Sequence, residues 1–204
     1  MIVIIDYGMG NLGSIQNILK KVGGEAEISR NLEVIAKAEK LILPGVGAFD
    51  QGMDNLRQGG FIEILTKKVV LEKVPILGIC LGMQLFSRES EEGVGKGLGW
   101  VAAKTVRFHF PVESPHKIPH MGWAPILRKG NCPLFADLPQ EHRFYFVHSY
   151  FVECEDQSIV AATSEHGVEF CSAIQSGNIY GVQFHPEKSH RFGMILMKNF
   201  LVLK

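Results

Sequence analysis

Three short segments of this chain carry residues that could together perform nucleophilic chemistry on a carbonyl group. In the first, Gly78–Gly82, Cys80 lies between an apolar run and Met83–Phe86, which is typical of the start of a helix. A nucleophile at a strand-to-helix corner sits on a strained turn, and flanking glycines let other segments approach closely. A helix N-terminus also favours the thiolate, the form of cysteine that attacks carbonyl carbon. Taken alone, the segment is equally compatible with a buried structural cysteine.

The second segment, Pro44–Gly47, directly follows the apolar run Leu41–Leu43. Loops at the carboxyl ends of parallel strands share one edge of a sheet, so this loop is expected to meet Cys80 there. Its glycines leave backbone N–H groups able to turn toward a developing oxyanion, and the N–H of Leu81 is a second donor. An ordinary glycine-rich turn is the alternative interpretation.

The third segment, Gly181–Glu187, places His185 after an apolar strand and Glu187 two residues later. Pro186 stiffens the link between them. This spacing lets the carboxylate hold one imidazole nitrogen while the other faces a thiol, as in a Cys-His-Glu triad. A single His-x-Glu is a common accident. Three such segments together, each at the end of a predicted strand, indicate one catalytic site.

The elements that must position these residues follow from the hydrophobic pattern. Ile2–Ile5, Leu41–Leu43 and Pro75–Ile79 are unalternating apolar runs of strand length, which are typical of strands covered on both faces. Between them, helices are predicted over Leu12–Val22 and about Ile62–Leu71. Strands alternating with helices in this way predict a doubly wound α/β sheet.

The second half of the chain has a different pattern, of closely spaced strands that include antiparallel pairs. They are predicted over Phe144–Val147, Tyr150–Glu153, Ile159–Thr163, Phe170–Gln175 and Ile179–Val182, followed by a helix over Phe192–Leu201. We therefore predict a single α/β domain over residues 1–204. Its sheet is expected to be mixed, mostly parallel and flanked by helices, with a flavodoxin-like core.

Composition excludes several classes of function. The 204 residues are 46% hydrophobic and carry no net charge, so electrostatics gives no reason to expect a nucleic-acid or membrane partner. The four cysteines are widely spaced and lack a C-x-x-C pair, which favours reduced thiols over a disulfide framework. The histidines show no metal-ligand spacing, and no metal or other cofactor is expected. The N-terminus resembles no export signal, so the expected location is the cytoplasm.

Together, Pro44–Gly47, Gly78–Gln84 and Gly181–Glu187 resemble the signature stretches of class I (triad-type) glutamine amidotransferases, and the resemblance covers essentially the whole chain. Three further segments narrow it: Asp6–Asn11, Pro119–Trp123 and Tyr145–Tyr150. They are similar to glutaminase subunits that supply ammonia to a (β/α)8-barrel synthase subunit, which closes an imidazole ring in histidine biosynthesis. The resemblance implies that glutamine is the substrate and that the heterodimer partner is the barrel subunit.

The same resemblance implies roles for individual residues. Cys80 would attack the side-chain amide of glutamine, His185 would move the proton, and Glu187 would orient His185; water would hydrolyse the resulting thioester. The implied oxyanion hole comprises Val46, Gly47 and Leu81. The implied glutamine pocket comprises Gly47, Gln84, Glu92, His148, Ser149 and Tyr150. The implied partner face comprises Asn11, His120, Met121, Trp123 and Lys188. As alternatives, Gln84 and Glu92 could be exposed polar residues, Trp123 a core residue and Lys188 a solvated charge.

Two departures from the family pattern leave further functions open. Ala124 follows Trp123 where asparagine is usual, and Arg107–Phe110 is unusual. Neither touches the triad, but both weaken the assignment of the acceptor, so a sugar amidotransferase of surface-polysaccharide synthesis is a second candidate. A stand-alone γ-glutamyl hydrolase and a catalytically inactive flavodoxin-like binding module are also compatible with the sequence. Asp6–Gly13 lacks both the G-x-G-x-x-G order and a P-loop lysine, so we interpret it as a turn and partner surface.

Overall fold

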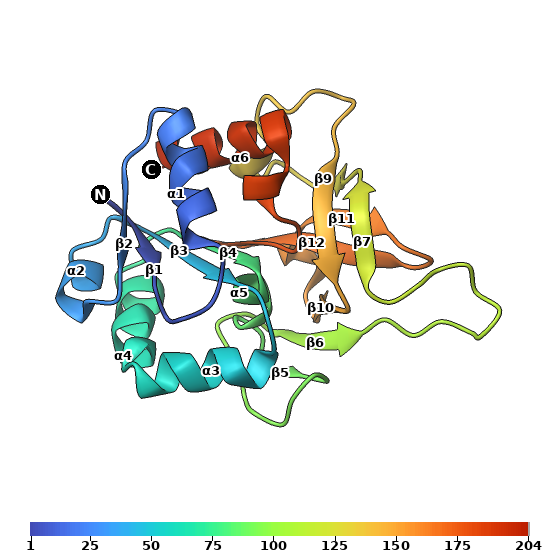
Figure 1. Cartoon of the computed structure of the whole chain (residues 1–204), viewed down its shortest axis with the longest axis horizontal. Coiled ribbons are helices and arrows are strands. Elements are labelled where there is room, and N and C mark those ends of the chain that lie inside the picture. Colours follow the sequence, from blue (N-terminus) through green and yellow to red (C-terminus); the bar gives the residue numbers. More distant parts are fainter. Residues whose placement is uncertain (204) are drawn as a thin grey trace.

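Five parallel strands form one half of the central sheet, and Cys80 is the last residue of one of them. The computed structural model describes residues 1–203, and its eleven-stranded sheet begins in the order β2-β1-β3-β4-β13, all parallel (Figure 1). The strands β1, β4 and β13 are buried along their whole length, as unalternating apolar sequences require. These strands are β1 (Ile2–Ile5), β2 (Ala26–Ser29), β3 (Lys40–Gly45), β4 (Ile76–Cys80) and β13 (Ile179–Val182).

Helices cover both faces of this parallel half. Ile2 and Ile4 pack with α1 and α6 in one core, whereas Val3 and Ile5 pack with α2, α3 and α4 in the other. Figure 1 shows the two groups of helices on opposite sides of the sheet. The helices are α1 (Leu12–Lys21), α2 (Leu32–Ala36), α3 (Phe49–Gln58), α4 (Phe61–Thr66), the π-helix η1 (Lys67–Leu71), α5 (Leu81–Gln84) and α6 (His190–Val202).

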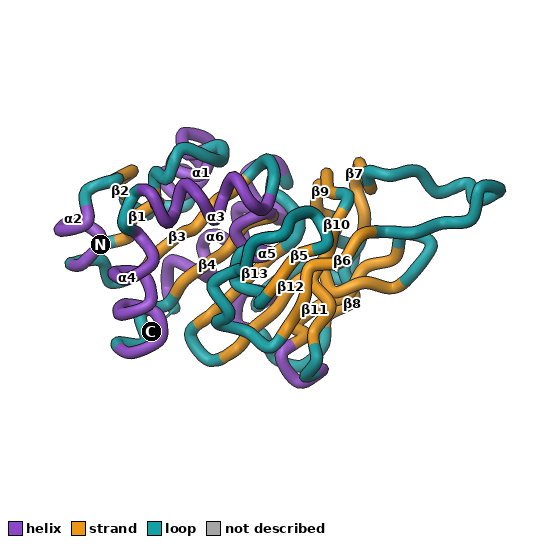
Figure 2. The backbone as a smooth tube through the Cα atoms, turned by 90° about the horizontal axis from the view of Figure 1, so that it is seen from below, coloured by secondary structure: helices purple, strands orange, loops and turns teal. Residues whose placement is uncertain are grey.

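The other half of the sheet is antiparallel around β12 and β10. From β13 the order continues through β12, β10, β6 and β5, while β11 and β8 branch from β12 and the pair β7–β9 forms a separate small sheet (Figure 2). These strands are β5 (Glu89–Ser90), β6 (Ala103–Arg107), β7 (His120–Ala124), β8 (Leu127–Arg128), β9 (Phe144–His148), β10 (Tyr150–Cys154), β11 (Val160–Glu165) and β12 (Glu169–Ser176). Short 3-10 turns η2 (Pro133–Phe135), η3 (Gln157–Ile159) and η4 (Pro186–Lys188) complete the chain.

The predicted α/β fold with a mixed sheet is confirmed, and so is each predicted strand, with ends that differ from the prediction by at most two residues. The helix predicted over Ile62–Leu71 is α4 followed without a break by the π-helix η1. The prediction omitted β2, α2, α3 and the strands between residues 89 and 128. The edge strand β2 is half-exposed and only four residues long, so it gives a weak pattern, whereas Phe49, Met53 and Leu56 of α3 recur at helical spacing and were overlooked.

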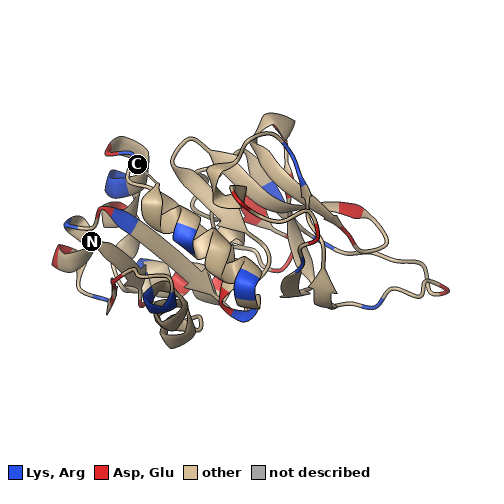
Figure 3. Cartoon of the chain, turned by 90° about the horizontal axis from the view of Figure 1, so that it is seen from above, with Lys and Arg blue, Asp and Glu red and all other residues tan. Residues whose placement is uncertain are grey.

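Acidic and basic residues, equal in number, are both distributed along the chain through the two halves of the molecule (Figure 3). Within residues 1–203, no helix is long and apolar enough to cross a membrane.

Candidate active site

Cys80 occupies a strained corner between β4 and α5. It is the last residue of β4, and its φ of +54° and ψ of −109° are unusual for any residue other than glycine. The helix α5 begins at the next residue, Leu81, and packs directly on β3. At Gly82 a Cβ atom would lie 1.8 Å from the Leu43 carbonyl oxygen, so only glycine permits this approach. The sequence therefore gives Cys80 the geometry of a nucleophile elbow.

His185 and Glu187 follow the strand next to Cys80. The strands β13 and β4 are parallel, with Val182 opposite Ile79, so their carboxyl ends lie at the same edge of the sheet. The His185 Nδ1 atom lies 2.8 Å from Glu187 Oε1, and both side chains are 2% exposed. Behind them, Gly193 lets α6 approach closely, because a Cβ there would lie 1.8 Å from the Pro186 carbonyl oxygen.

The surroundings of His185 favour its protonated form when Cys80 is a thiolate. Burial by itself lowers the pKa of His185, but the interactions with Cys80 and Glu187 outweigh burial and raise that pKa to about 10. Within residues 1–203, the Nε2 atom forms no hydrogen bond. Glu187 thus holds one imidazole nitrogen, while the other stays available on the side of Cys80, close enough for the thiolate charge to stabilise the imidazolium.

A cavity of about 390 Å³ opens at this edge of the sheet. It is lined by Val46, Gly47, Cys80, Leu81, Gln84, Glu92, Pro119, Val147, His148, Ser149, Tyr150 and His185. The residues predicted for the oxyanion hole and the glutamine pocket are therefore brought together around the thiol, and Glu187 lies behind His185. Pro119 and Val147 were not predicted. Both belong to segments that carried the family resemblance, but an apolar side chain gives no chemical signal of its own.

The loop Pro44–Gly47 lies beside the thiol because β3 and β4 pair in parallel, with Gly45 opposite Cys80. Gly47 has a φ of +117°, and Val46 is 44% exposed at the mouth of the cavity. The hydroxyl of Tyr7 donates a hydrogen bond of 2.7 Å to the Pro44 carbonyl oxygen. Burial, followed by the charge of Cys80, raises the pKa of Tyr7. Tyr7 was not predicted as a site residue, because its segment was interpreted as a turn and partner surface.

Gln84 is buried, rather than exposed on a helix surface. Its Nε2 donates to the Tyr150 carbonyl oxygen at 2.9 Å and to Gln183 Oε1 at 3.1 Å. Gln183, in turn, is fully buried, and its Nε2 lies 3.6 Å from Cys80 Sγ. Gln183 stands in the segment that carries His185, and its contact with the nucleophile depends on the packing between strands, which the sequence alone does not specify.

Glu92 is partly buried and joins the cavity to α3. Its Oε2 accepts a hydrogen bond of 2.9 Å from the Phe49 backbone N–H at the start of that helix. Burial is the largest cause that raises the pKa of Glu92, and the nearby charge of Asp50 raises it further, against the Phe49 hydrogen bond. Asp50 also accepts hydrogen bonds from the Val94 and Gly95 N–H groups, which fixes the loop that carries Glu92.

His148 is held as a neutral imidazole in a defined tautomer. Its Nδ1 lies 2.8 Å from the Tyr150 carbonyl oxygen, which can only accept, so Nδ1 carries the proton. Its Nε2 then accepts from His120 Nδ1 at 3.0 Å. Burial, the largest cause, lowers the pKa of His148 to about 3 and that of His120 to about 4. The side chain of His120 therefore faces inward to His148, and is not displayed on the surface.

Of the other residues predicted for a partner face, Met121 and Trp123 lie on β7, and Lys188 is the last residue of η4. Met121 is 62% exposed and Trp123 42% exposed, so Trp123 is not a core residue. The Trp123 ring stacks on His190 with 5.3 Å between ring centroids, and Lys188 Nζ lies 5.7 Å from the centre of the Tyr145 ring. Asn11 immediately precedes α1.

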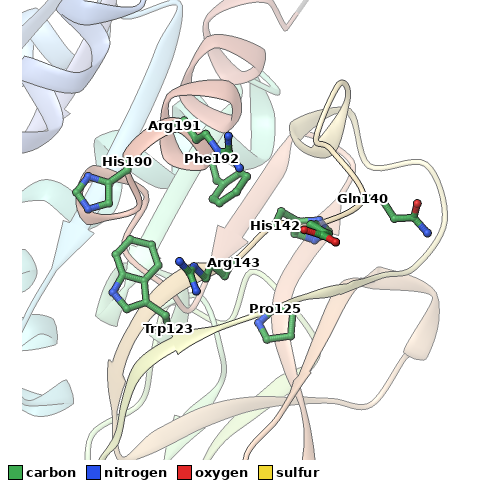
Figure 4. A pocket seen from close by; sticks show the side chains of 9 residues that line it. Trp123, Pro125, Gln140, His142, Arg143, His190, Arg191 and Phe192 are labelled. Atoms are coloured by element: carbon green, nitrogen blue, oxygen red, sulfur yellow. The ribbon is translucent and has the colours of Figure 1, made fainter.

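Beside Trp123 and His190 lies a larger hollow of about 1090 Å³, which also contains Arg143 and Arg191 (Figure 4). None of the triad residues lines it. Within residues 1–203, no group of three or more histidine, cysteine, aspartate or glutamate side chains is arranged to hold a metal ion.

Comparison with known proteins identifies the family. Residues 3–203 match the family described as glutamine amidotransferase class-I, and the chain belongs to that family. Among curated proteins, it is 57% identical over 201 residues to imidazole glycerol phosphate synthase subunit HisH 2 of Methanococcus maripaludis, with 98% of each chain covered. It is 46% identical over 203 residues to the subunit HisH 2 of Pseudomonas aeruginosa, with 100% of each chain covered.

Solved structures agree on the fold. A putative GMP synthase protein from Thermoplasma acidophilum superimposes with a TM-score of 0.72 at 22% identity, covering 98% of this chain and 91% of that one. A structure described as PurLQS from Thermotoga maritima has a TM-score of 0.68 at 18% identity, covering 98% and 96%.

Proposed function

We propose that this chain is the glutaminase subunit of an imidazole glycerol phosphate synthase, which hydrolyses glutamine to glutamate and ammonia with a Cys80-His185-Glu187 triad. The observation that carries the proposal is the cavity in which a cysteine at a strained corner, a histidine paired with a buried carboxylate and a glycine-rich loop meet. Full-length relatives named as that subunit support the choice among glutaminases.

In the first step, the Cys80 thiolate attacks the amide carbon of the glutamine side chain and forms a tetrahedral adduct. Its oxyanion lies against the N–H of Leu81 and an N–H of the Val46–Gly47 loop. The C–N bond then breaks, and the nitrogen takes the proton held on His185 Nε2. Ammonia leaves and a glutamyl thioester remains on Cys80. The raised pKa of His185 keeps that proton in place until the leaving nitrogen accepts it.

In the second step, His185, now neutral, takes a proton from water, and the resulting hydroxide attacks the thioester carbon. The C–S bond breaks, which restores the Cys80 thiolate opposite the His185 imidazolium and releases glutamate. The sum of the two steps is glutamine plus water giving glutamate plus ammonia. Glu187 accepts the hydrogen bond from His185 Nδ1 in both steps, which stabilises the imidazolium form of His185.

Recognition of glutamine is assigned to Gln84, Glu92 and the chain from His148 to Tyr150. Both N–H groups of Gln84 are already used inside the protein, so the atom it offers to a ligand is its acceptor oxygen. Glu92 supplies a carboxylate for the α-ammonium group of glutamine. The polar side chains and peptide groups around the thiol thus match an amino acid whose side chain ends in a neutral amide.

The ammonia is proposed to pass to a (β/α)8-barrel subunit that binds the face containing Met121, Trp123 and Lys188. Ammonia released into water would be protonated and diluted, so hydrolysis is useful only inside the complex. The Val46–Gly47 peptides supply a switch: with glycine on both sides of Val46, rotation of one peptide moves an N–H toward or away from the oxyanion. A few kcal/mol between those states changes the active fraction strongly.

The test is to measure glutamine turnover by the chain alone, with the barrel subunit, and with the barrel plus its nucleotide substrate. We expect low turnover alone and strong stimulation in the complete mixture. Full activity of the isolated chain, unchanged by either addition, would favour a stand-alone hydrolase. Ala124, which replaces the usual asparagine at the end of β7, leaves a sugar amidotransferase as the second acceptor to assay in the same format.

A further inference from the structure

We propose that Gln183 is a catalytic residue, whose side-chain amide donates a hydrogen bond to the Cys80 sulfur and favours the reactive thiolate. The proposal deepens the proposed glutaminase function and rests on it for the identity of the nucleophile. Gln183 Nε2 lies 3.6 Å from Cys80 Sγ, within hydrogen-bond reach of a sulfur atom, and the side chain is fully buried. A donor in a dry setting stabilises a neighbouring anion more strongly than the same donor in water.

The orientation of the Gln183 amide is fixed by a chain of partners that begins at the Tyr150 carbonyl oxygen. That oxygen can only accept, so the Gln84 atom 2.9 Å away must be the amide nitrogen. The second N–H of Gln84 then points to Gln183, 3.1 Å away, and only the Gln183 oxygen can accept it. The amide nitrogen of Gln183 is left facing Cys80.

The reverse orientation of Gln183 is excluded by the same contacts. If its amide were flipped, an N–H of Gln183 and the second N–H of Gln84 would face each other in the buried interior with no acceptor between them. The flipped oxygen would also face Cys80 Sγ, where an acceptor stabilises the thiol and repels the thiolate. The network thus selects the one arrangement that presents a donor to the nucleophile.

His148 also donates to the Tyr150 carbonyl oxygen and so helps to fix this arrangement. Its Nδ1–H is the second donor to the Tyr150 carbonyl oxygen, at 2.8 Å, so both lone pairs of that oxygen are engaged. Tyr150 begins β10, whereas Gln183 directly follows β13. The polarity of the hydrogen bond at the sulfur is therefore set by a backbone group of the antiparallel half of the sheet.

The test compares the wild type with Gln183→Met and Gln183→Glu. Methionine keeps the length of the side chain but cannot donate, and glutamate replaces the donor by a carboxylate. Alkylation of Cys80 by iodoacetamide is followed by mass spectrometry of the peptide that contains it, across a range of pH. For Gln183→Met we expect about tenfold slower alkylation at pH 7, the factor that corresponds to one lost hydrogen bond to a charged group. The rate should recover at high pH, and Gln183→Glu should be slower still.

Glutamine turnover with the complete partner mixture provides the second readout. Because Gln183 lies behind the cavity lining, kcat should fall about tenfold or more while KM changes little. Gln51→Met and Gln51→Glu, at an exposed position on α3, are matched controls that should leave both readouts unchanged.

The proposal is overturned if folded Gln183→Met and Gln183→Glu alkylate like the wild type, or if neither variant folds, which would make Gln183 a packing residue. The rate of Cys80 alkylation can be measured whether or not the protein hydrolyses glutamine. If the wild type did not hydrolyse glutamine, the proposed function would be refuted. If the Gln183 variants were nevertheless alkylated more slowly than the wild type, the role of Gln183 at the Cys80 sulfur would stand.

Discussion

The parallel and antiparallel halves of the sheet contribute to the site in different ways. The parallel half supplies the groups that react: Cys80 ends β4, and His185 follows the adjacent strand β13. The antiparallel half and the small β7–β9 sheet supply groups that hold and orient: Val147 and His148 belong to β9, and Tyr150 begins β10. Reactive groups thus stand at strand ends that the fold brings to one edge, whereas orienting groups depend on cross-strand register.

This difference predicts how substitutions in each half should behave. Changes in the parallel half should abolish or slow the reaction while the fold persists, because they remove reactive side chains from the ends of strands that are buried along their whole length. Changes in the antiparallel half and in the β7–β9 sheet should act on stability and on the position of the ligand. Four experiments, in order of expected effect, test the contrast.

The largest effect is expected for Cys80→Ala, which removes the nucleophile. Glutamine turnover should be abolished, and the midpoint of thermal unfolding should stay within a few degrees of the wild type, since one small side chain is lost. Activity is measured as glutamate formation with the complete partner mixture, and stability by circular dichroism. Turnover above background in Cys80→Ala would show that another group attacks the amide. Cys132→Ala, a buried thiol outside the cavity, is the matched control and should remain active.

The second effect distinguishes His185 from Glu187. His185→Ala should lose about 10²- to 10⁴-fold in kcat, the usual contribution of a general acid–base group. Glu187→Ala should lose less, because Glu187 orients His185 and stabilises its charge without touching the substrate. The measurement is the kcat for glutamine hydrolysis of each variant, from steady-state kinetics. A more severe loss in Glu187→Ala than in His185→Ala would reverse the proposed roles.

The third effect concerns stability in acid, through His120 and His148 of the small β7–β9 sheet. His120 and His148 have pKa values lowered to about 4 and about 3, mainly by burial, whereas an unfolded histidine takes up a proton near pH 6.5. The unfolded state therefore binds more protons as the pH falls below 6.5, and the free energy of unfolding should drop by on the order of 3 kcal/mol by pH 4. His185 has the opposite shift, and its contribution is kept below pH 6.5 and lost only as the pH rises through about 10.

Urea unfolding at several pH values measures this dependence. His120→Phe should unfold with a weaker dependence on pH between 6.5 and 4, because one titrating group is gone from the aromatic cluster. His109→Gln, at an exposed position, should follow the wild type. An unchanged slope in His120→Phe would mean that burial of this histidine does not control acid sensitivity.

The smallest effect is expected for Tyr7→Phe, which removes the hydroxyl that holds the Pro44 carbonyl oxygen. The oxyanion loop would then be less fixed, and kcat should fall about tenfold, equivalent to ~1.4 kcal/mol of transition-state stabilisation. Tyr180→Phe changes another buried tyrosine, on β13 and outside the cavity lining, and should have no such effect. Equal kcat values for Tyr7→Phe and the wild type would mean that the Tyr7 hydroxyl does not support the loop.

The contrast between the halves also explains what the sequence could predict. Local apolar runs precede Cys80, Pro44–Gly47 and His185. Because the carboxyl ends of parallel strands lie at one edge of a sheet, these runs are enough to predict that the three come together. Pairs such as His120 and His148 meet through the register of β7 with β9, which no local pattern specifies. For the same reason, the contact of Gln183 with Cys80 had no signal in the sequence, although its segment was recognised.

Gly82 and Gly193 have a consequence for redesign of this enzyme by directed evolution. At each position a Cβ atom would lie 1.8 Å from a carbonyl oxygen, so even alanine must displace a helix, α5 beside Cys80 or α6 beside Glu187. A mutant library that samples these two positions would consist mostly of inactive members. Diversity for new amide substrates is better placed at Val46 and Pro119, whose side chains line the cavity.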